Sequence, residues 1–153
     1  MEQALIEHNL APLNSRRDIA KLGLIHRTMI GSGPIHFQNC FTRAPMSTRP
    51  DGREAQKRHD KQIVSYRQGD FLQLVTHSIL GLVDIYNLLP KYVVNAWTVK
   101  LFQHRLQELL KASVTDDVSN WKKIFSPRDP LFCHALRKWH GWEGTGKVPE
   151  WLR

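Results

Sequence analysis

Adjacent carboxylates are the feature of this sequence that most directly suggests catalysis, because paired aspartates hold two metal ions in nucleic-acid polymerases. The pair here is Asp116 and Asp117. Polymerase chemistry places such a pair in a strand–turn–strand setting with an apolar or aromatic flank, whereas these residues follow Ser-Val-Thr and precede a helical pattern. We therefore interpret both aspartates as charges at the N-terminus of a helix, where a carboxylate stabilises the macrodipole.

A second group of side chains has the chemistry of zinc ligands. It consists of His36, Cys40, Cys133, His134 and His140. No C-x-x-C or H-x-x-x-H spacing occurs, and the alternative is that the cysteines are small buried hydrophobes and the histidines surface groups. We predict no metal and no cofactor. Two cysteines are too few for a disulfide framework, so we expect free thiols and an intracellular protein, nuclear or cytoplasmic.

Other catalytic motifs are missing from the sequence. It contains no G-x-S-x-G, no P-loop and no G-x-G-x-x-G. The stretch Gly31-Ser32-Gly33 follows a helical pattern, so we interpret it as a helix stop rather than a phosphate cradle. We predict that this chain is not an enzyme.

The charge of the chain points to polyanionic partners. Its 22 Lys and Arg exceed its 14 Asp and Glu, for a formal net charge of +8. Nucleic acid is the first partner that such a balance favours, and an anionic membrane is the second. No run of about 18 apolar residues occurs and the N-terminus lacks a basic signal region, so we expect no membrane span.

Two segments concentrate the cations, and we predict phosphate contacts in both. The candidates are Arg49, Arg53, Lys57, Arg58, Lys61, Lys122, Lys123, Arg137 and Lys138. The first five lie in the stretch 42–61, which has no aromatic residue and so offers phosphate contact without base stacking. The others lie near Trp121, Trp139 and Trp142, an arrangement that suits single strands. In both segments the alternative is a solvated charged face, with the tryptophans on apolar helix faces.

The elements that position these candidate residues are predicted to be mostly helices. Apolar residues at helical spacing predict a helix over 16–30, begun by a capping box of Ser15 and Asp18. A short helix follows Pro34. The fold class we predict is mainly α, a small domain of about five to six helices.

The later helices follow from prolines, caps and spacing. A buried helix over 79–89 ends before Pro90, and one more turn follows. Thr98 is a plausible N-cap for the next helix, whose apolar stripe includes Phe102, Leu106 and Leu109. Two short helices complete the pattern, one after Asp117 and one after Pro130.

The stretch 62–76 has two readings. Residues 62–67 and 71–76 can pair as a short β-hairpin around a Gly-Asp turn, or the second half can begin the next helix. We expect a helical domain over 1–127 with an exposed basic loop at 42–61. Residues 128–153 then form a short helix and an irregular, basic, tryptophan-containing tail.

Three stretches carry a resemblance to a known family. They are LNSRRDIAKLGLIHRTMIGSGPIHFQNCF at 13–41, KRHDKQIVSY at 57–66, and a pattern comprising Ser78, Tyr86, Asn87, Leu89, Pro90, Val93, Val94, Phe102, Leu106 and Leu109. FSPR at 125–128 adds a further match. In this order and spacing they resemble the region that follows the polymerase core in non-LTR (LINE-type) retrotransposon reverse transcriptases, over about three quarters of the chain.

The resemblance implies a piece of an RNA-directed DNA polymerase whose catalytic part lies elsewhere. Such enzymes carry a [FY]-x-D-D motif, and this sequence contains none. The function we expect is therefore a truncated, non-catalytic, accessory RNA- or DNA-binding region that works beside a polymerase core supplied by another chain. The alternative is a helical protein-interaction module whose stripe at Phe102, Leu106 and Leu109 packs on such a core.

Overall fold

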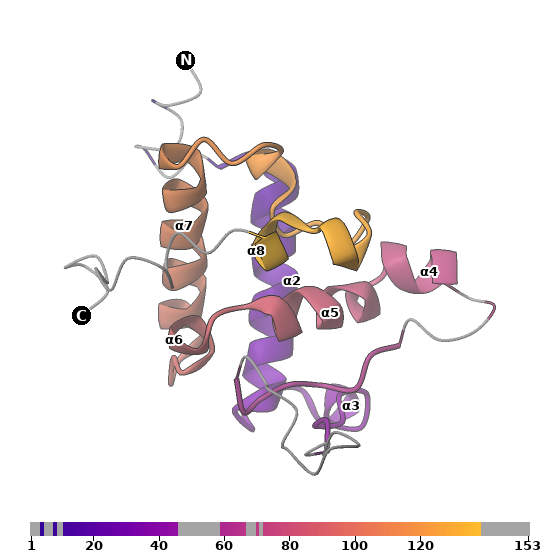
Figure 1. The fold of residues 1–153 in the computed structure, drawn as a ribbon. Helices are drawn as coiled ribbons and strands as arrows, with labels where there is room; N and C mark the ends of the chain where they lie inside the picture. The colour runs from indigo at the N-terminus through magenta and orange to yellow at the C-terminus, as the bar shows by residue number, and fades with distance from the viewer. Residues whose placement is uncertain are drawn as a thin grey trace, which may run out of the picture.

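The fold is mainly helical, as predicted. The structure is a computed structural model that describes residues 4, 8, 11–45, 59–66, 70 and 72–138. The α-helices are α2 (Leu13–Met29), α3 (Ile35–Gln38), α4 (Leu72–His77), α5 (Leu82–Leu88), α6 (Lys91–Val94), α7 (Val99–Thr115) and α8 (Ala135–Lys138). Single 3-10 turns form η1 (Ile79–Gly81), η2 (Trp121–Lys123) and η3 (Leu131–Cys133). The long helices α2 and α7 pack side by side, and α5 crosses α2 (Figure 1).

Helix α2 forms where its spacing predicts, but its start differs. Ile19, Leu22 and Ile25 are buried on one face, and Gly31 beyond its end has a φ of 83°, the left-handed conformation that stops a helix. The capping box is wrong, because the helix begins at Leu13 without a side-chain cap. Ser15 Oγ instead donates to the backbone oxygen of Lys122 at 2.9 Å.

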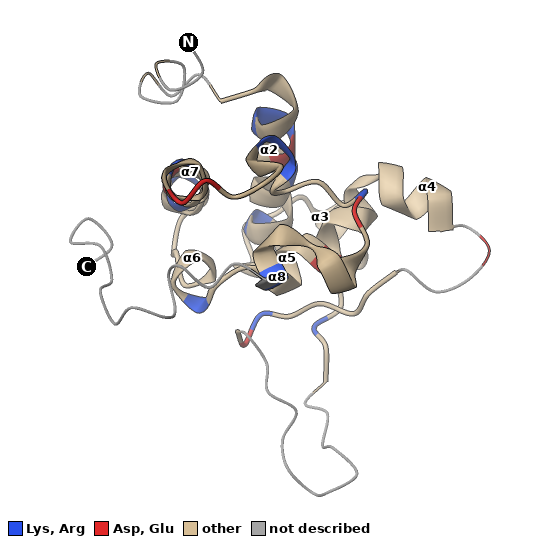
Figure 2. Ribbon diagram, turned by 45° about the horizontal axis from the view of Figure 1, so that its top comes forward, with Lys and Arg blue, Asp and Glu red and all other residues tan. Residues whose placement is uncertain are grey.

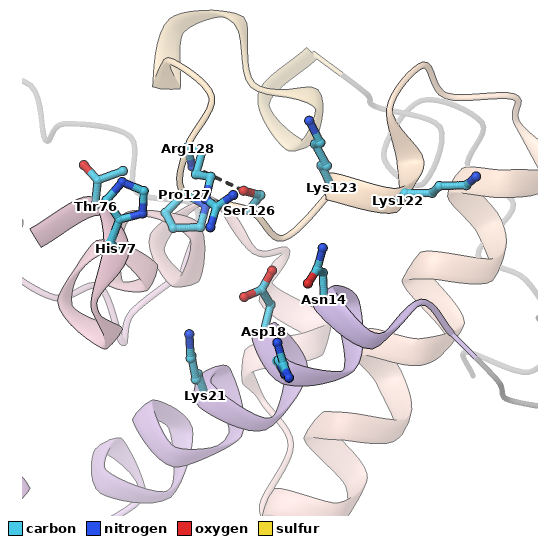
Figure 3. Close-up of a pocket in the computed structure, with 11 residues that line it drawn as sticks. Asn14, Asp18, Lys21, Thr76, His77, Lys122, Lys123, Ser126, Pro127 and Arg128 are labelled. Atoms are coloured by element: carbon cyan, nitrogen blue, oxygen red, sulfur yellow. Dashed lines mark hydrogen bonds between the residues drawn. The ribbon is translucent and has the colours of Figure 1, made fainter. Parts of the chain in front are cut away.

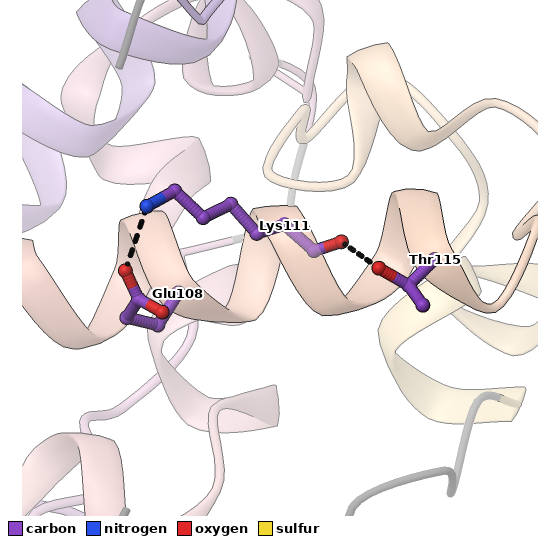
Figure 4. Close-up of polar contacts among 3 residues, drawn as sticks. All are labelled: Glu108, Lys111 and Thr115. Atoms are coloured by element: carbon purple, nitrogen blue, oxygen red, sulfur yellow. Dashed lines mark hydrogen bonds and ion pairs between the residues drawn. The ribbon is translucent and has the colours of Figure 1, made fainter. Parts of the chain in front are cut away.

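Helix α7 supplies the other long wall of the core. Thr98 Oγ1 accepts a hydrogen bond from the Leu101 amide at 3.1 Å, which confirms the predicted N-cap. Leu106 is fully buried where α7 packs on α2. On a more accessible face, Lys111 pairs with Glu108 at 3.0 Å and Thr115 Oγ1 donates to the Lys111 backbone oxygen (Figure 4).

Asp116 and Asp117 follow the C-terminus of α7 rather than capping a new helix. Helix α7 continues to Thr115, and Asp117 then adopts a φ of 50°. The next turn, η2, begins after Asn120, which also has a positive φ of 62°. Aspartate and asparagine tolerate this conformation better than most residues, so the segment closes a helix and makes a tight turn. Our interpretation of these aspartates as N-terminal charges was wrong.

The β-hairpin predicted within 62–76 does not form, since residues 72–77 are helix α4. Ile63 instead makes an isolated antiparallel bridge with Arg43. The side chain of Asn87 pairs with the same residue, accepting from the Ile63 amide at 2.8 Å and donating to its carbonyl at 2.7 Å. Ile63 is 1% exposed, so burial and the Asn87 contacts hold it in place without a second strand. The alternative, in which the second half begins a helix, is confirmed.

The first residues of the predicted tail belong to the core. Leu136 of α8 is fully buried, and α8 packs on α5. The tail beyond it, 139–153, lies outside the described residues. No helix in the described ranges combines the length and apolarity needed to cross a bilayer.

Candidate nucleic-acid interface

Most of the predicted loop cations fall outside the described part of the chain. These are Arg49, Arg53, Lys57 and Arg58. Lys61, which follows them, is half-buried, and its ammonium donates to the backbone oxygen of Val94 at 3.2 Å. This lysine is therefore tied to the fold, and its charge is less available to a ligand than the sequence suggested.

Lys122 and Lys123 line a polar pocket of about 160 Å³ beside the N-terminal half of α2 (Figure 3). The cations around it are Arg17, Lys21, Lys122, Lys123 and Arg128, and the pocket has a single carboxylate, that of Asp18. Asn14, Thr76, His77 and Ser126 add polar groups. Basic residues also occur on α6 and α8 (Figure 2). The five cations named above instead line one cavity. Five cations around one cavity make it the strongest candidate for an anion.

One wall of the pocket is a single face of α2. Asn14, Arg17, Asp18 and Lys21 are spaced by three and four residues, so they project from the same side of the helix. The apolar positions of α2 face the core, which leaves this polar face at the surface. The helical period therefore places two cations and the carboxylate together.

The opposite wall comes from η2 and the chain that follows it. Ile124 and Phe125 are each 1% exposed and anchor this segment in the core. The Ser15 hydroxyl binds the backbone of Lys122, and the Ser126 hydroxyl accepts from the Arg128 amide at 3.4 Å (Figure 3). The first of these contacts ties the wall to α2 across 107 residues of sequence, and the second orders the wall itself.

Trp121 does not offer an open stacking face at this site. Its ring is half-buried and packs against the core. The Lys122 ammonium lies 5.7 Å from the ring centroid, a cation–π contact. The apolar-face alternative therefore describes Trp121 better than the stacking prediction, while Trp139 and Trp142 lie outside the described residues.

Asp18 is the one acidic residue among those that line the pocket. Burial raises the pKa of its carboxyl group, and the positive charges of Lys21 and Arg128 partly offset that rise. The carboxylate has thus lost hydration that the neighbouring cations only partly replace.

The predicted phosphate contacts do not include Arg17, Lys21 and Arg128, because the prediction rests on local concentrations of cations and on neighbouring tryptophans. A signal for the first two was present, since they occupy the polar face of the predicted helix. The place of Arg128 in the pocket depends on how the segment after η2 folds back onto α2, which no local pattern predicts. Arg137 is exposed on α8 and does not line this pocket, and Lys138 ends α8 with a side chain outside the described part.

A second polar cluster lies in the core. His26 Nε2 is 2.8 Å from the Ala96 carbonyl oxygen, which can only accept, so Nε2 carries the proton. The Tyr86 hydroxyl then donates to Nδ1 at 3.0 Å. The imidazole stacks on Phe102 with 4.1 Å between centroids, and burial lowers the pKa of His26 to about 4. The ring is therefore neutral at physiological pH.

The same cluster joins the three stretches that carry the family resemblance. His59 Nε2 donates to the Tyr86 carbonyl at 2.9 Å, next to the pairing between Asn87 and Ile63. His26 comes from the first stretch, His59 and Ile63 from the second, and Tyr86 and Asn87 from the third. Their contacts are internal hydrogen bonds and ring packing, which is a structural role.

The zinc candidates are not brought together. Within the described ranges, no three His, Cys, Asp or Glu side chains are placed to hold one metal ion. Both ring nitrogens of His134 are engaged, with Ser126 O at 3.0 Å and the Leu136 amide at 3.2 Å. Cys40 and Cys133 are free thiols. His140 lies outside the described residues.

Comparisons with known proteins find no relative of this chain. Neither the protein-family models, nor the sequences of curated proteins, nor the solved structures yield a match to this chain. What points to a function is therefore the charge and the contacts of the pocket, together with the sequence motifs.

Proposed function

We propose that this chain binds the phosphate backbone of RNA or DNA without catalysing a reaction. The observation that carries the proposal is the gathering of Arg17, Lys21, Lys122, Lys123 and Arg128 around one pocket that has one carboxylate. Cations in such an array neutralise phosphates and release condensed counterions, which supplies most of the free energy of sequence-independent binding. The net charge of +8 adds long-range attraction of the same sign.

The accompanying biological role is that of an accessory region of a non-LTR reverse transcriptase. Two features support it: the order of the sequence motifs, and the meeting of His26, His59 and Tyr86 in one buried cluster. The residues of this cluster depend on one another for hydrogen bonds. This gives a physical reason why the three motifs should be found in the same sequence. The polymerase core, which holds the catalytic residues of that family, would be the partner of this region inside the cell.

Neutralising pocket cations should weaken binding and flatten its salt dependence. We expect Lys123→Gln with Arg128→Gln to lower the slope of log affinity against log salt by roughly 0.7 per charge on single-stranded RNA. Fluorescence anisotropy or filter binding from about 50 to 200 mM salt measures this slope.

The matched control is Lys91→Gln with Lys100→Gln, two exposed lysines on α6 and α7 that do not line the pocket. This double variant removes the same charge and should change the slope less. Equal losses in both variants would show that net charge, not the pocket, governs binding. A wild-type protein that binds at no salt concentration would refute the proposed function.

The alternative function, a helical protein-interaction module, requires an exposed apolar stripe on α7, and that stripe is buried. Phe102, Leu106 and Leu109 are at most 1% exposed, within the core that includes α2. The exposed apolar side chains that remain include Ile35, Leu74 and Phe132, which lie on three different elements. A monomer that binds no hydrophobic dye would argue against this alternative.

A further inference from the structure

Asp18 is unexpected in a pocket that would serve phosphate alone. A carboxylate repels a phosphate group, and five surrounding cations would attract it more strongly without this charge. Figure 3 shows Asp18 and Lys21 leaving α2 on the side that faces Ser126 and Arg128. The pocket therefore presents both an acceptor and donors to whatever enters it.

Asp18 and Lys21 together offer an acceptor and a donor that match one edge of a guanine base. A carboxylate accepts two parallel N–H bonds, and an ammonium only donates. Of the four RNA bases, only guanine presents two neighbouring N–H donors, N1–H and N2–H, beside an acceptor, O6. Positions three residues apart on a helix are neighbours, so one edge of a base can meet both side chains.

The size and remaining walls of the pocket suit a single base rather than a whole nucleotide. A cavity of about 150 Å³ holds a benzene ring, so this pocket of about 160 Å³ has room for the flat ring of one base, with the ribose and phosphate outside it. Its lining includes the His77 imidazole, one of the aromatic rings on which unstacked bases pack in RNA complexes. Lys123 and Arg128 then remain for the phosphate of the same nucleotide.

We propose that this pocket binds one unstacked guanine nucleotide of a single strand, with Asp18 accepting from N1–H and N2–H, Lys21 donating to O6, and Lys123 and Arg128 holding the phosphate. This inference rests on the proposed function and names the base that the pocket selects. Burial raises the pKa of Asp18 because its carboxylate has lost hydration, and the two N–H donors of guanine restore hydrogen bonds to it. Adenine and uracil cannot supply this pair of donors.

The test compares labelled 11-nucleotide oligouridines that carry one central guanine, adenine, cytosine or inosine. The full chain should bind the guanine strand about tenfold more tightly than the adenine strand. Inosine keeps N1–H and O6 but lacks the 2-amino group, so its affinity should be intermediate. This comparison needs no variant protein and does not depend on whether a mutant folds.

Asp18→Asn supplies the second arm of the test. Removing the negative charge should leave affinity for the adenine strand equal or higher, while the preference for guanine disappears. Asp70→Asn, at an exposed position outside the pocket, should keep the preference. Circular dichroism checks that both variants retain their helical content.

The outcomes separate the two proposals. Equal, salt-dependent binding of all four strands overturns guanine selection and leaves phosphate binding intact. A guanine preference that survives Asp18→Asn also overturns the inference, since Asp18 would then serve only as a counter-charge for Lys21 and Arg128. Free guanosine monophosphate that competes as well as the guanine strand overturns the assignment to a strand. Binding of no strand refutes both proposals.

Discussion

Phe102→Ala should lower the free energy of unfolding by about 3–5 kcal/mol, the range for truncating a large buried aromatic side chain. Phe102 is fully buried on α7, stacks on His26 and lies 6.0 Å from the Tyr86 ring. Its removal leaves a cavity and also uncovers the imidazole whose hydrogen bonds link α2 to the chain before α7. Urea denaturation at neutral pH measures the change.

The control for this prediction is Trp97→Ala, two residues before the same helix. Trp97 is 78% exposed, so its loss should change stability by less than about 0.5 kcal/mol. If Phe102→Ala costs no more than Trp97→Ala, α7 does not pack on α2 as described. The apolar stripe of α7 would then be available to bind a partner protein, as the interaction-module alternative requires.

The second large effect is a loss of stability in mild acid. Burial lowers the pKa of His26 to about 4 from its ordinary value of 6.5, so the unfolded chain takes up a proton at a higher pH than the folded chain does. The stability that depends on neutral His26 is therefore complete above about pH 6.5. It declines as the pH falls toward 4, by about 3 kcal/mol at 1.36 kcal/mol per pKa unit. Urea midpoints at pH 7.5, 5.5 and 4.5 follow this decline.

His26→Leu isolates the contribution of this residue. The variant should be less stable at neutral pH, because the Tyr86 hydroxyl and the Ala96 carbonyl lose their partner, but it should lose less additional stability between pH 6.5 and 4. Burial raises the pKa of Asp18, so the contribution of Asp18 to stability increases as the pH falls, opposite to that of His26. This contribution is the same in the wild-type protein and in His26→Leu. His104→Gln, at an exposed position, is the matched histidine control. A pH dependence that is unchanged in His26→Leu would contradict the prediction.

The helices that the sequence predicts well are those with strong local signals. Apolar spacing located α2 and α7, Thr98 marked the start of α7, and Pro90 marked the end of α5. Each of these signals acts over a few residues, through side-chain period, capping or the missing amide of proline. They therefore do not depend on how the chain folds back on itself.

The errors occur where a distant contact replaces a local one. Ser15 has the type and position of a helix cap, but its hydroxyl binds Lys122 O. Ile63 has the pattern of a hairpin strand, yet it pairs with Arg43 and with the side chain of Asn87. In both cases a favourable partner far along the chain competes with the local motif, and spacing alone carries no information about that partner.

The sequence by itself determined the helical class, the positions of the two long helices and the positive charge, since these depend on composition and short-range interactions. Only the tertiary structure decided that Lys123 shares a pocket with Arg17 and Lys21, and that Phe102 and His26 are internal. The physical reason is that a pocket and a core are defined by which faces of distant elements meet. That choice minimises exposed apolar surface over the whole chain rather than within any one segment.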